Sequence, residues 1–209
     1  MKGNLLYLMD PLCAWCHTFS PKVERLTREF PHDLVLEILP WGMFPSQREV
    51  DENFGSWLER EVRKIQNESS AIFGDNYYEL LRSGKLTLDS RQPSRAILTV
   101  QYIWPQRTLE FACEMEKAFF IRGENPNDEK FYLDIVSGMG LTKHVFLDDF
   151  YSERAVEAQN NAFEHAKQIS NDFPSLYFKN GKQLILLGNR MSDYEKIKSE
   201  CETQIRKTE

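Results

Sequence analysis

Two cysteines separated by two residues, Cys13 and Cys16, lie where an apolar segment gives way to a segment with helical periodicity. Residues 4–9 are mostly apolar and are followed by an Asp-Pro pair, which predicts a buried strand closed by a turn. From the first cysteine onward, apolar residues recur every three or four positions, which predicts a helix over residues 13–30. The sequence therefore places a C-x-x-C pair at the first turn of a helix that follows a strand.

The start of a helix changes the chemistry of a cysteine. The first backbone N–H groups have no partner there and the positive end of the helix dipole points at the residue, so the thiolate is favoured over the thiol. The thiolate is the reactive form in disulfide exchange. We therefore expect Cys13 to be a nucleophile, and Cys16, three residues further into the helix, to resolve the mixed disulfide.

Three other uses of the same pair are weaker. The stretch C-A-W-C-H matches the pattern to which c-type haem is attached, but that chemistry requires export and fits poorly beside a buried strand and a long helix. A zinc site needs two more ligands, and neither the other two cysteines nor the four histidines form a second pair at ligand spacing. The third use is two cysteines that only pack. We expect redox chemistry, carried by the cysteines themselves and without a bound cofactor.

The composition is that of an ordinary globular protein, with 41% hydrophobic and 28% charged residues. The net charge of -6 is spread over segments of mixed sign, and no stripe of lysine and arginine alternates with aromatics, so we expect no nucleic-acid partner. The apolar runs are far shorter than the roughly 20 residues of a membrane span, and no signal-peptide core precedes the first strand. We expect a cytoplasmic protein without a membrane partner.

Segments further along the chain complete the element order. Residues 34–39 form a second apolar run that predicts a strand, and residues from about 54 to 170 show helical periods broken by Gly and Pro, which predicts some five to seven helices and no strand. The runs 175–178 and 184–187 flank an Asn-Gly pair, which predicts a hairpin with a type I′ turn, and a last helix is expected over 194–205. This order predicts an α/β protein, a thioredoxin fold with a large all-helical domain inserted between its β-α-β and β-β-α halves.

Several stretches resemble a known family. C-A-W-C-H-T-F-S-P and F-P-S-L-Y-F-K-N-G-K resemble the thioredoxin active site and cis-proline segment, while D-P-L-C-A-W-C, L-P-W-G-M-F-P and R-Q-P-S-R-A-I-L are similar to DsbA-like oxidoreductases, in particular the FrnE-like branch. The resemblance implies a discontinuous thioredoxin-like domain of residues 1–50 and 168–209, and an inserted helical domain of residues 51–167. It also implies that Pro174 is a cis-proline packed beside the two cysteines, with the backbone of Phe173 turned toward substrate.

Two positions depart from the pattern of these families. FrnE-like proteins commonly carry Pro after the first cysteine, whereas this chain has Ala14, which keeps its backbone N–H. Thioredoxins carry a buried carboxylate six residues before the first cysteine, whereas this chain has Tyr7. The redox potential therefore cannot be taken from relatives. The sequence also does not identify the group that exchanges a proton with Cys16.

Other residues near the pair are further candidates. Trp15, between the cysteines, is expected to be an exposed aromatic that contacts substrate, because a reactive loop faces solvent. His17 could tune the thiolate or contact substrate, although a partly exposed helix residue without a role is the simpler interpretation. Asp10 is expected to cap the helix, to approach the thiolate or only to form the turn. Cys113 and Cys201 lie in helical patterns and are expected to be structural.

These features predict a DsbA-like thiol-disulfide oxidoreductase or isomerase that acts on protein or low-molecular-weight disulfides, with glutathione or a thioredoxin-type protein as candidate reductants. A reducing cytosol favours reduction or isomerisation over bulk disulfide formation. Two alternatives stay open. Kappa-class glutathione transferases and related isomerases share the inserted helices but normally carry Ser in place of Cys13 and lack the second cysteine. A thioredoxin-fold binding protein would need no reactive thiol.

Overall fold

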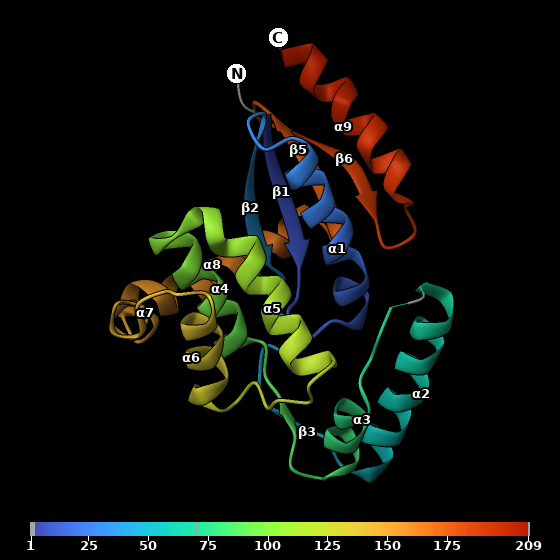
Figure 1. Ribbon diagram of the computed structural model, residues 1–209, viewed down its shortest axis with the longest axis vertical. Coiled ribbons are helices and arrows are strands. Elements are labelled where there is room, and N and C mark those ends of the chain that lie inside the picture. The colour runs from blue at the N-terminus through green and yellow to red at the C-terminus, as the bar shows by residue number, and fades with distance from the viewer. Residues whose placement is uncertain (1–2, 70, 209) are drawn as a thin grey trace.

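A four-stranded mixed sheet forms the centre of the computed structural model, which describes residues 3–69 and 71–208 (Figure 1). The strands lie in the order β2-β1-β5-β6. β1 runs parallel to β2 and antiparallel to β5, and β5 and β6 form an antiparallel hairpin. The strands span Gly3–Met9 (β1), Leu34–Pro40 (β2), Ser175–Asn180 (β5) and Gln183–Asn189 (β6). β1 is thus an inner strand of the sheet, and it leads directly into the C-x-x-C segment.

Helices cover both faces of the sheet because successive side chains of a strand point to opposite faces. The odd-numbered residues of β1 belong to a core shared with α1 (Ala14–Glu29) and α9 (Tyr194–Thr208). The even-numbered Leu6 and Leu8 belong to a second core with α8 (Glu153–Ile169). Figure 1 shows α1 and α9 in front of the sheet and α8 behind it. The predicted thioredoxin fold is confirmed by this arrangement.

The segment between β2 and β5 is mainly helical, and its described part holds seven α-helices, in line with the sequence pattern. None of the helices in the described residues is long and apolar enough to cross a membrane. The predicted boundary between the inserted domain and the second thioredoxin-like segment, at residue 167, falls inside α8. The other elements of this segment are β3 (Arg48–Glu49), α2 (Glu52–Ser69), α3 (Asp75–Arg82), β4 (Thr87–Leu88), α4 (Arg91–Ile103), a 3-10 turn (Pro105–Arg107), α5 (Thr108–Phe120), α6 (Glu129–Gly138) and α7 (Lys143–Phe150).

Two details differ from the sequence-based expectation. The helical segment contains a strand, because β4 pairs with β3 in a separate two-stranded sheet. Strands of two residues are too short to produce a hydrophobic alternation, so the sequence pattern does not reveal them. The β5-β6 hairpin is confirmed, but Asn180 pairs with Gln183, so the two loop residues are Gly181 and Lys182 rather than Asn-Gly. Gly181, with φ +58°, takes the first loop position, which primed hairpin turns require to have a positive φ.

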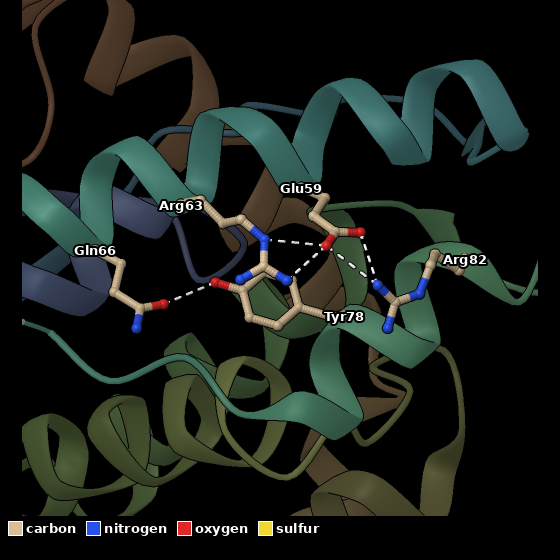
Figure 2. Close-up of polar contacts among 5 residues, drawn as sticks. All are labelled: Glu59, Arg63, Gln66, Tyr78 and Arg82. Atoms are coloured by element: carbon tan, nitrogen blue, oxygen red, sulfur yellow. Dashed lines mark hydrogen bonds and ion pairs between the residues drawn. The ribbon is translucent and has the colours of Figure 1, made fainter.

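Polar side chains hold α2 against α3 (Figure 2). The Glu59 carboxylate accepts hydrogen bonds from Arg63 at 2.7 Å and from Arg82, at the end of α3, at 3.0 Å. The Arg63 guanidinium also lies 4.2 Å from the centroid of the Tyr78 ring, and the Tyr78 hydroxyl donates to Gln66 at 2.8 Å. Exposed ion pairs stabilise weakly one at a time, but this set joins the two helices at both ends of one carboxylate. It fixes α2 as a wall of the site described below.

The backbones of α2 and α3 approach closely at Gly55. A Cβ atom at this position would lie 2.4 Å from the carbonyl oxygen of Leu81. We expect Gly55→Ala to lower the free energy of unfolding by about 1–3 kcal/mol, because the helices must separate to admit the methyl group. Gly138→Ala is the matched control, since a Cβ there meets no atom within 4 Å, and it should raise that free energy by up to about 1 kcal/mol. Urea unfolding of the two variants measures both effects, and equal stabilities would contradict the close packing.

Candidate active site

Cys13 occupies the N-cap position of α1, as the sequence predicts for the start of a helix. Its φ and ψ of -91° and 116° are extended, and its carbonyl oxygen accepts the first helical hydrogen bonds, from the N–H groups of Cys16 at 2.9 Å and His17 at 3.1 Å. Its own N–H donates to the carbonyl oxygen of Asp10 at 3.1 Å. The residue is 6% exposed. The backbone therefore holds the Cys13 sulfur at the positive end of α1.

Cys16 lies beneath Cys13 and has no exposed surface. Burial raises the pKa of its thiol well above the usual value, and the hydrogen bond with Cys13 and the charges of Cys13 and Glu116 raise it further. The Asp10 N–H, 3.4 Å from the Cys16 sulfur, opposes this shift by donating to it. The two thiols are therefore unequal, because Cys16 is held as a protonated thiol inside the protein.

Asp10 is a buried anchor for the segments around the cysteines. Its Oδ1 accepts from the Leu12 N–H at 3.0 Å and the Ser90 hydroxyl at 3.1 Å, and its Oδ2 accepts from the Met43 N–H at 2.7 Å. Burial raises the pKa of the carboxyl, and these hydrogen bonds oppose the rise. Of the roles expected for this residue, the turn is confirmed, because bonding the N–H two residues later is typical of an Asx turn. The helix cap is wrong, since α1 has no side-chain cap.

A chain of hydroxyl groups leads from the region of Cys16 to a buried acid that the sequence analysis missed. The Tyr7 hydroxyl lies 3.5 Å from the Cys16 carbonyl oxygen and 3.0 Å from the Ser20 hydroxyl, which donates to Glu116 on α5 at 3.0 Å. Glu116 is 1% exposed, and burial raises the pKa of its carboxyl well above the usual value. The signal in the sequence is an acidic residue inside the apolar face of a helix, four residues after Ala112.

His17 is buried, so its interpretation as a partly exposed residue is wrong. The loop between α2 and α3 covers it, and its Nε2 lies 3.0 Å from the carbonyl oxygen of Ile72. Its ring stacks on Phe120 at 5.1 Å and meets Phe73 edge-on at 5.2 Å. Burial lowers the pKa of the imidazole. His17 therefore attaches the α2-α3 loop to the active-site helix, and a substrate contact stays a prediction.

Trp15 is less exposed than the sequence analysis predicts. It is half-buried and packs against the main core, because the C-x-x-C loop lies close to the protein surface rather than projecting from it. The Arg190 guanidinium lies 5.8 Å from the centroid of its ring. The contact of Trp15 with substrate stays a prediction.

A groove with a volume of about 220 Å³ opens beside the Cys13 residue. Its walls come from both parts of the chain, since α1 and the loop after β2 form one side and α2, α3, β4 and α5 form the rest. The lining residues are Leu12, Cys13, Ala14, Trp15, Met43, Phe44, Trp57, Leu58, Glu61, Val62, Ile65, Tyr77, Leu88 and Phe119. The groove gives a disulfide-bearing ligand access to the nucleophile, whereas Cys16 is not among the lining residues.

The peptide bond between Phe173 and Pro174 is cis, which confirms the expectation from the family resemblance. Ser175 pairs with Leu8 of β1, so the buried Pro174 lies near the end of β1 from which the cysteine segment departs. The Phe173 ring stacks on Trp41 at 4.5 Å. Contact of Pro174 with the two sulfurs and of the Phe173 backbone with substrate stay predictions.

Comparison with known proteins supports the fold. No family model matches the chain. Two curated proteins, each described as ClpXP adapter protein SpxH, from Halalkalibacterium halodurans and Shouchella clausii, are 21% identical over 82% of this chain. The chain spans only 57% and 56% of the lengths of these two relatives.

Solved structures match over nearly the whole chain. A candidate protein disulfide isomerase from Nitrosomonas europaea has a TM-score of 0.88 at 20% identity, with 100% of both chains covered. The cytosolic disulfide reductase DsbM from Pseudomonas aeruginosa has a TM-score of 0.83 at 21% identity, covering 97% of this chain and 98% of DsbM. DsbA from Xylella fastidiosa has a TM-score of 0.58 at 13% identity, covering 99% and 86%. The chain therefore has the DsbA-like fold that the sequence resemblance implies.

The four cysteines should differ sharply in reactivity. All four are free thiols, but Cys13 alone lines the groove. Burial raises the pKa of Cys16 and Cys113 well above the usual value and that of Cys201 to about 12. We therefore expect iodoacetamide at neutral pH to label Cys13 in the folded protein and the other three only after unfolding. Peptide mapping by mass spectrometry identifies the labelled residue, and equal labelling of Cys113 would contradict this assignment.

Proposed function

We propose that the protein is a thiol-disulfide oxidoreductase in which Cys13 is the nucleophile and Cys16 the resolving thiol. The observation that carries this proposal is the asymmetry of the pair, with one sulfur at a helix N-cap in a groove and the other buried and protonated beneath it. The solved structures of the same fold, described as a disulfide reductase, a candidate isomerase and an oxidoreductase, support it.

The reaction proceeds by two exchanges of sulfur. The Cys13 thiolate attacks one sulfur of a substrate disulfide, the substrate S–S bond breaks and the other substrate sulfur leaves as a thiolate. Cys16 then loses its proton and attacks the Cys13 sulfur, which releases the second substrate thiolate and leaves a Cys13-Cys16 disulfide. The substrate gains two electrons and the protein loses two. A dithiol or two thiols must return those electrons before the next cycle.

Glu116 is the group that we assign to the proton of Cys16. The Ser20 hydroxyl, one helical turn after Cys16, donates to Glu116, and the Tyr7 hydroxyl lies beside both Ser20 and the Cys16 backbone. A carboxyl whose pKa is raised by burial can take up a proton near neutral pH and give it back. It would accept the Cys16 proton during resolution and return it when the disulfide is reduced.

We infer that the protein works as a reductase or isomerase in the cytoplasm. DsbM is described as a cytosolic disulfide reductase, and one of its structures contains glutathione. A reducing compartment favours this direction, with glutathione or a thioredoxin-type protein as the electron donor. The presence of Cys13 and of a second thiol argues against a kappa-class transferase. The buried acid-thiol pair argues against a protein that only binds, since perturbed groups of this kind cluster at functional sites.

Single-cysteine variants test the order of the two exchanges. Cys16→Ser should accumulate mixed disulfides between Cys13 and a substrate such as insulin, because the resolving attack is missing. Cys13→Ser should form none. Non-reducing gel electrophoresis and mass spectrometry of the trapped species measure both. Full disulfide reductase activity in either variant would refute the mechanism.

Replacement of the buried acid tests the proton transfer. Glu116→Gln keeps the shape and can accept from Ser20 but cannot take up a proton, so we expect the resolving step to slow about a hundredfold at pH 7. Its rate should then rise about tenfold per pH unit, as the thiol must ionise to solvent. The release of a peptide thiol from a preformed mixed disulfide at Cys13 reports this step.

Two controls separate this effect from a structural one. Glu114→Gln, on the same helix but paired with Lys117 near the surface, should leave the resolving rate unchanged. Alkylation of Cys13 should proceed at the wild-type rate in both variants, because the nucleophile is intact. A Glu116→Gln protein that resolves normally across the pH range would show that another group takes the proton.

A further inference from the structure

The groove beside Cys13 contains one acidic side chain and no basic one. Among its lining residues, Glu61 is the only Asp or Glu, and none is Lys, Arg or His. The remaining wall is apolar except for the Tyr77 hydroxyl, whose pKa is raised by burial, and the Cys13 sulfur itself. A ligand in this groove therefore meets apolar surface and a single negative charge.

The acidic residue lies in the middle of an apolar row on α2. Trp57, Glu61 and Ile65 follow one another at four-residue spacing, so they lie on one face of the helix and all line the groove. Trp57 is 48% exposed, and Met43 on the facing loop is 41% exposed. Large apolar side chains this exposed at a groove indicate a surface that an apolar ligand covers.

The volume of the groove limits what can enter it. Small-molecule sites usually enclose about 300–1,000 Å³, whereas this groove holds about 220 Å³. It can accept one or two side chains next to a cysteine, and the rest of the ligand must lie along the surface. A polypeptide meets this condition better than a small thiol that depends on being enclosed.

Nearby cations do not reverse the charge of the groove. Lys64 donates to Glu61 at 2.7 Å, but its side chain is 65% exposed and it is not among the lining residues. Arg190 is also outside the lining and faces the Trp15 ring. The chain as a whole carries a net charge of -6, so long-range attraction favours cationic partners. Glutathione, with two carboxylates and one amine, has the opposite charge.

We propose that the groove selects protein disulfides with an apolar residue next to the cysteine and a Lys or Arg close by, that it disfavours glutathione disulfide, and that Glu61 determines this preference. This inference rests on the proposed function, because it concerns the substrate of the same cysteine pair. The apolar residue enters between Trp57 and Met43, and the cation pairs with Glu61 at the groove wall.

Three disulfide probes test the proposal. Two are peptides that share an apolar residue beside the cysteine and differ only in a neighbouring Lys or Glu, and the third is glutathione disulfide. The wild-type protein should reduce the Lys peptide with a kcat/KM about three- to tenfold above that of the Glu peptide, as expected for one partly exposed ion pair. Glutathione disulfide should be the slowest of the three. The preference should shrink at high salt because screening weakens the pair.

Charge reversal at one position identifies the residue responsible. Glu61→Lys should invert the preference between the Lys and Glu peptides by a similar factor, while Glu68→Gln, an exposed acid elsewhere on α2, should leave it unchanged. Thermal unfolding of both variants verifies that they fold as the wild type does. Equal reduction of the two peptides by wild type, a preference that Glu61→Lys does not change, or fastest reduction of glutathione disulfide would overturn the proposal. Failure to reduce any probe would instead refute the proposed function on which it rests.

Discussion

The buried carboxylate of Asp10 joins the three segments from which the site is built. It accepts hydrogen bonds from Leu12 in the cysteine segment, from Met43 after β2 and from Ser90 before α4. Each hydrogen bond to a charged acceptor contributes about 1.5–3 kcal/mol, and a carboxylate with no exposed surface is stable only with such partners. The position of the nucleophile relative to the groove wall therefore depends on this one side chain.

A second buried acid makes the inserted helices part of the redox chemistry. Glu116 comes from α5, yet its charge acts on Cys16, and its hydrogen bond comes from Ser20 on the active-site helix. The strand position that carries an acid in thioredoxins holds Tyr7 here, and its hydroxyl belongs to the same chain of contacts. The helical segment thus supplies a group that β1 lacks, which explains why a costly buried carboxyl is present between α1 and α5.

The same division of labour holds for substrate recognition. The thioredoxin-like part supplies the two cysteines, and α2 supplies the row of side chains that includes Glu61. The network around Glu59 fixes α2 on α3, and His17 ties the loop between these helices to α1. Recognition and catalysis are therefore mechanically connected, because the wall of the groove is attached to the helix that carries the nucleophile.

Local patterns were sufficient for the elements that depend on neighbours in the chain. The strand before Cys13, the helix after it and the β5-β6 hairpin follow from spacing, and the family motifs added the cis bond at Pro174. Two-residue strands such as β4 carry no periodic signal, and the one-residue shift of the hairpin turn depends on pairing across the sheet.

The tertiary structure alone decided which side chains meet around the cysteines. His17 is buried by a loop 55 residues away, and Ser20 meets Glu116 across 96 residues. No spacing rule reaches that far, because helices determine contacts only within a few residues of each other. The sequence by itself determined that a reactive C-x-x-C begins a helix on a thioredoxin fold. Packing of the inserted helices decided which acid lies beneath it and which charge lies beside it.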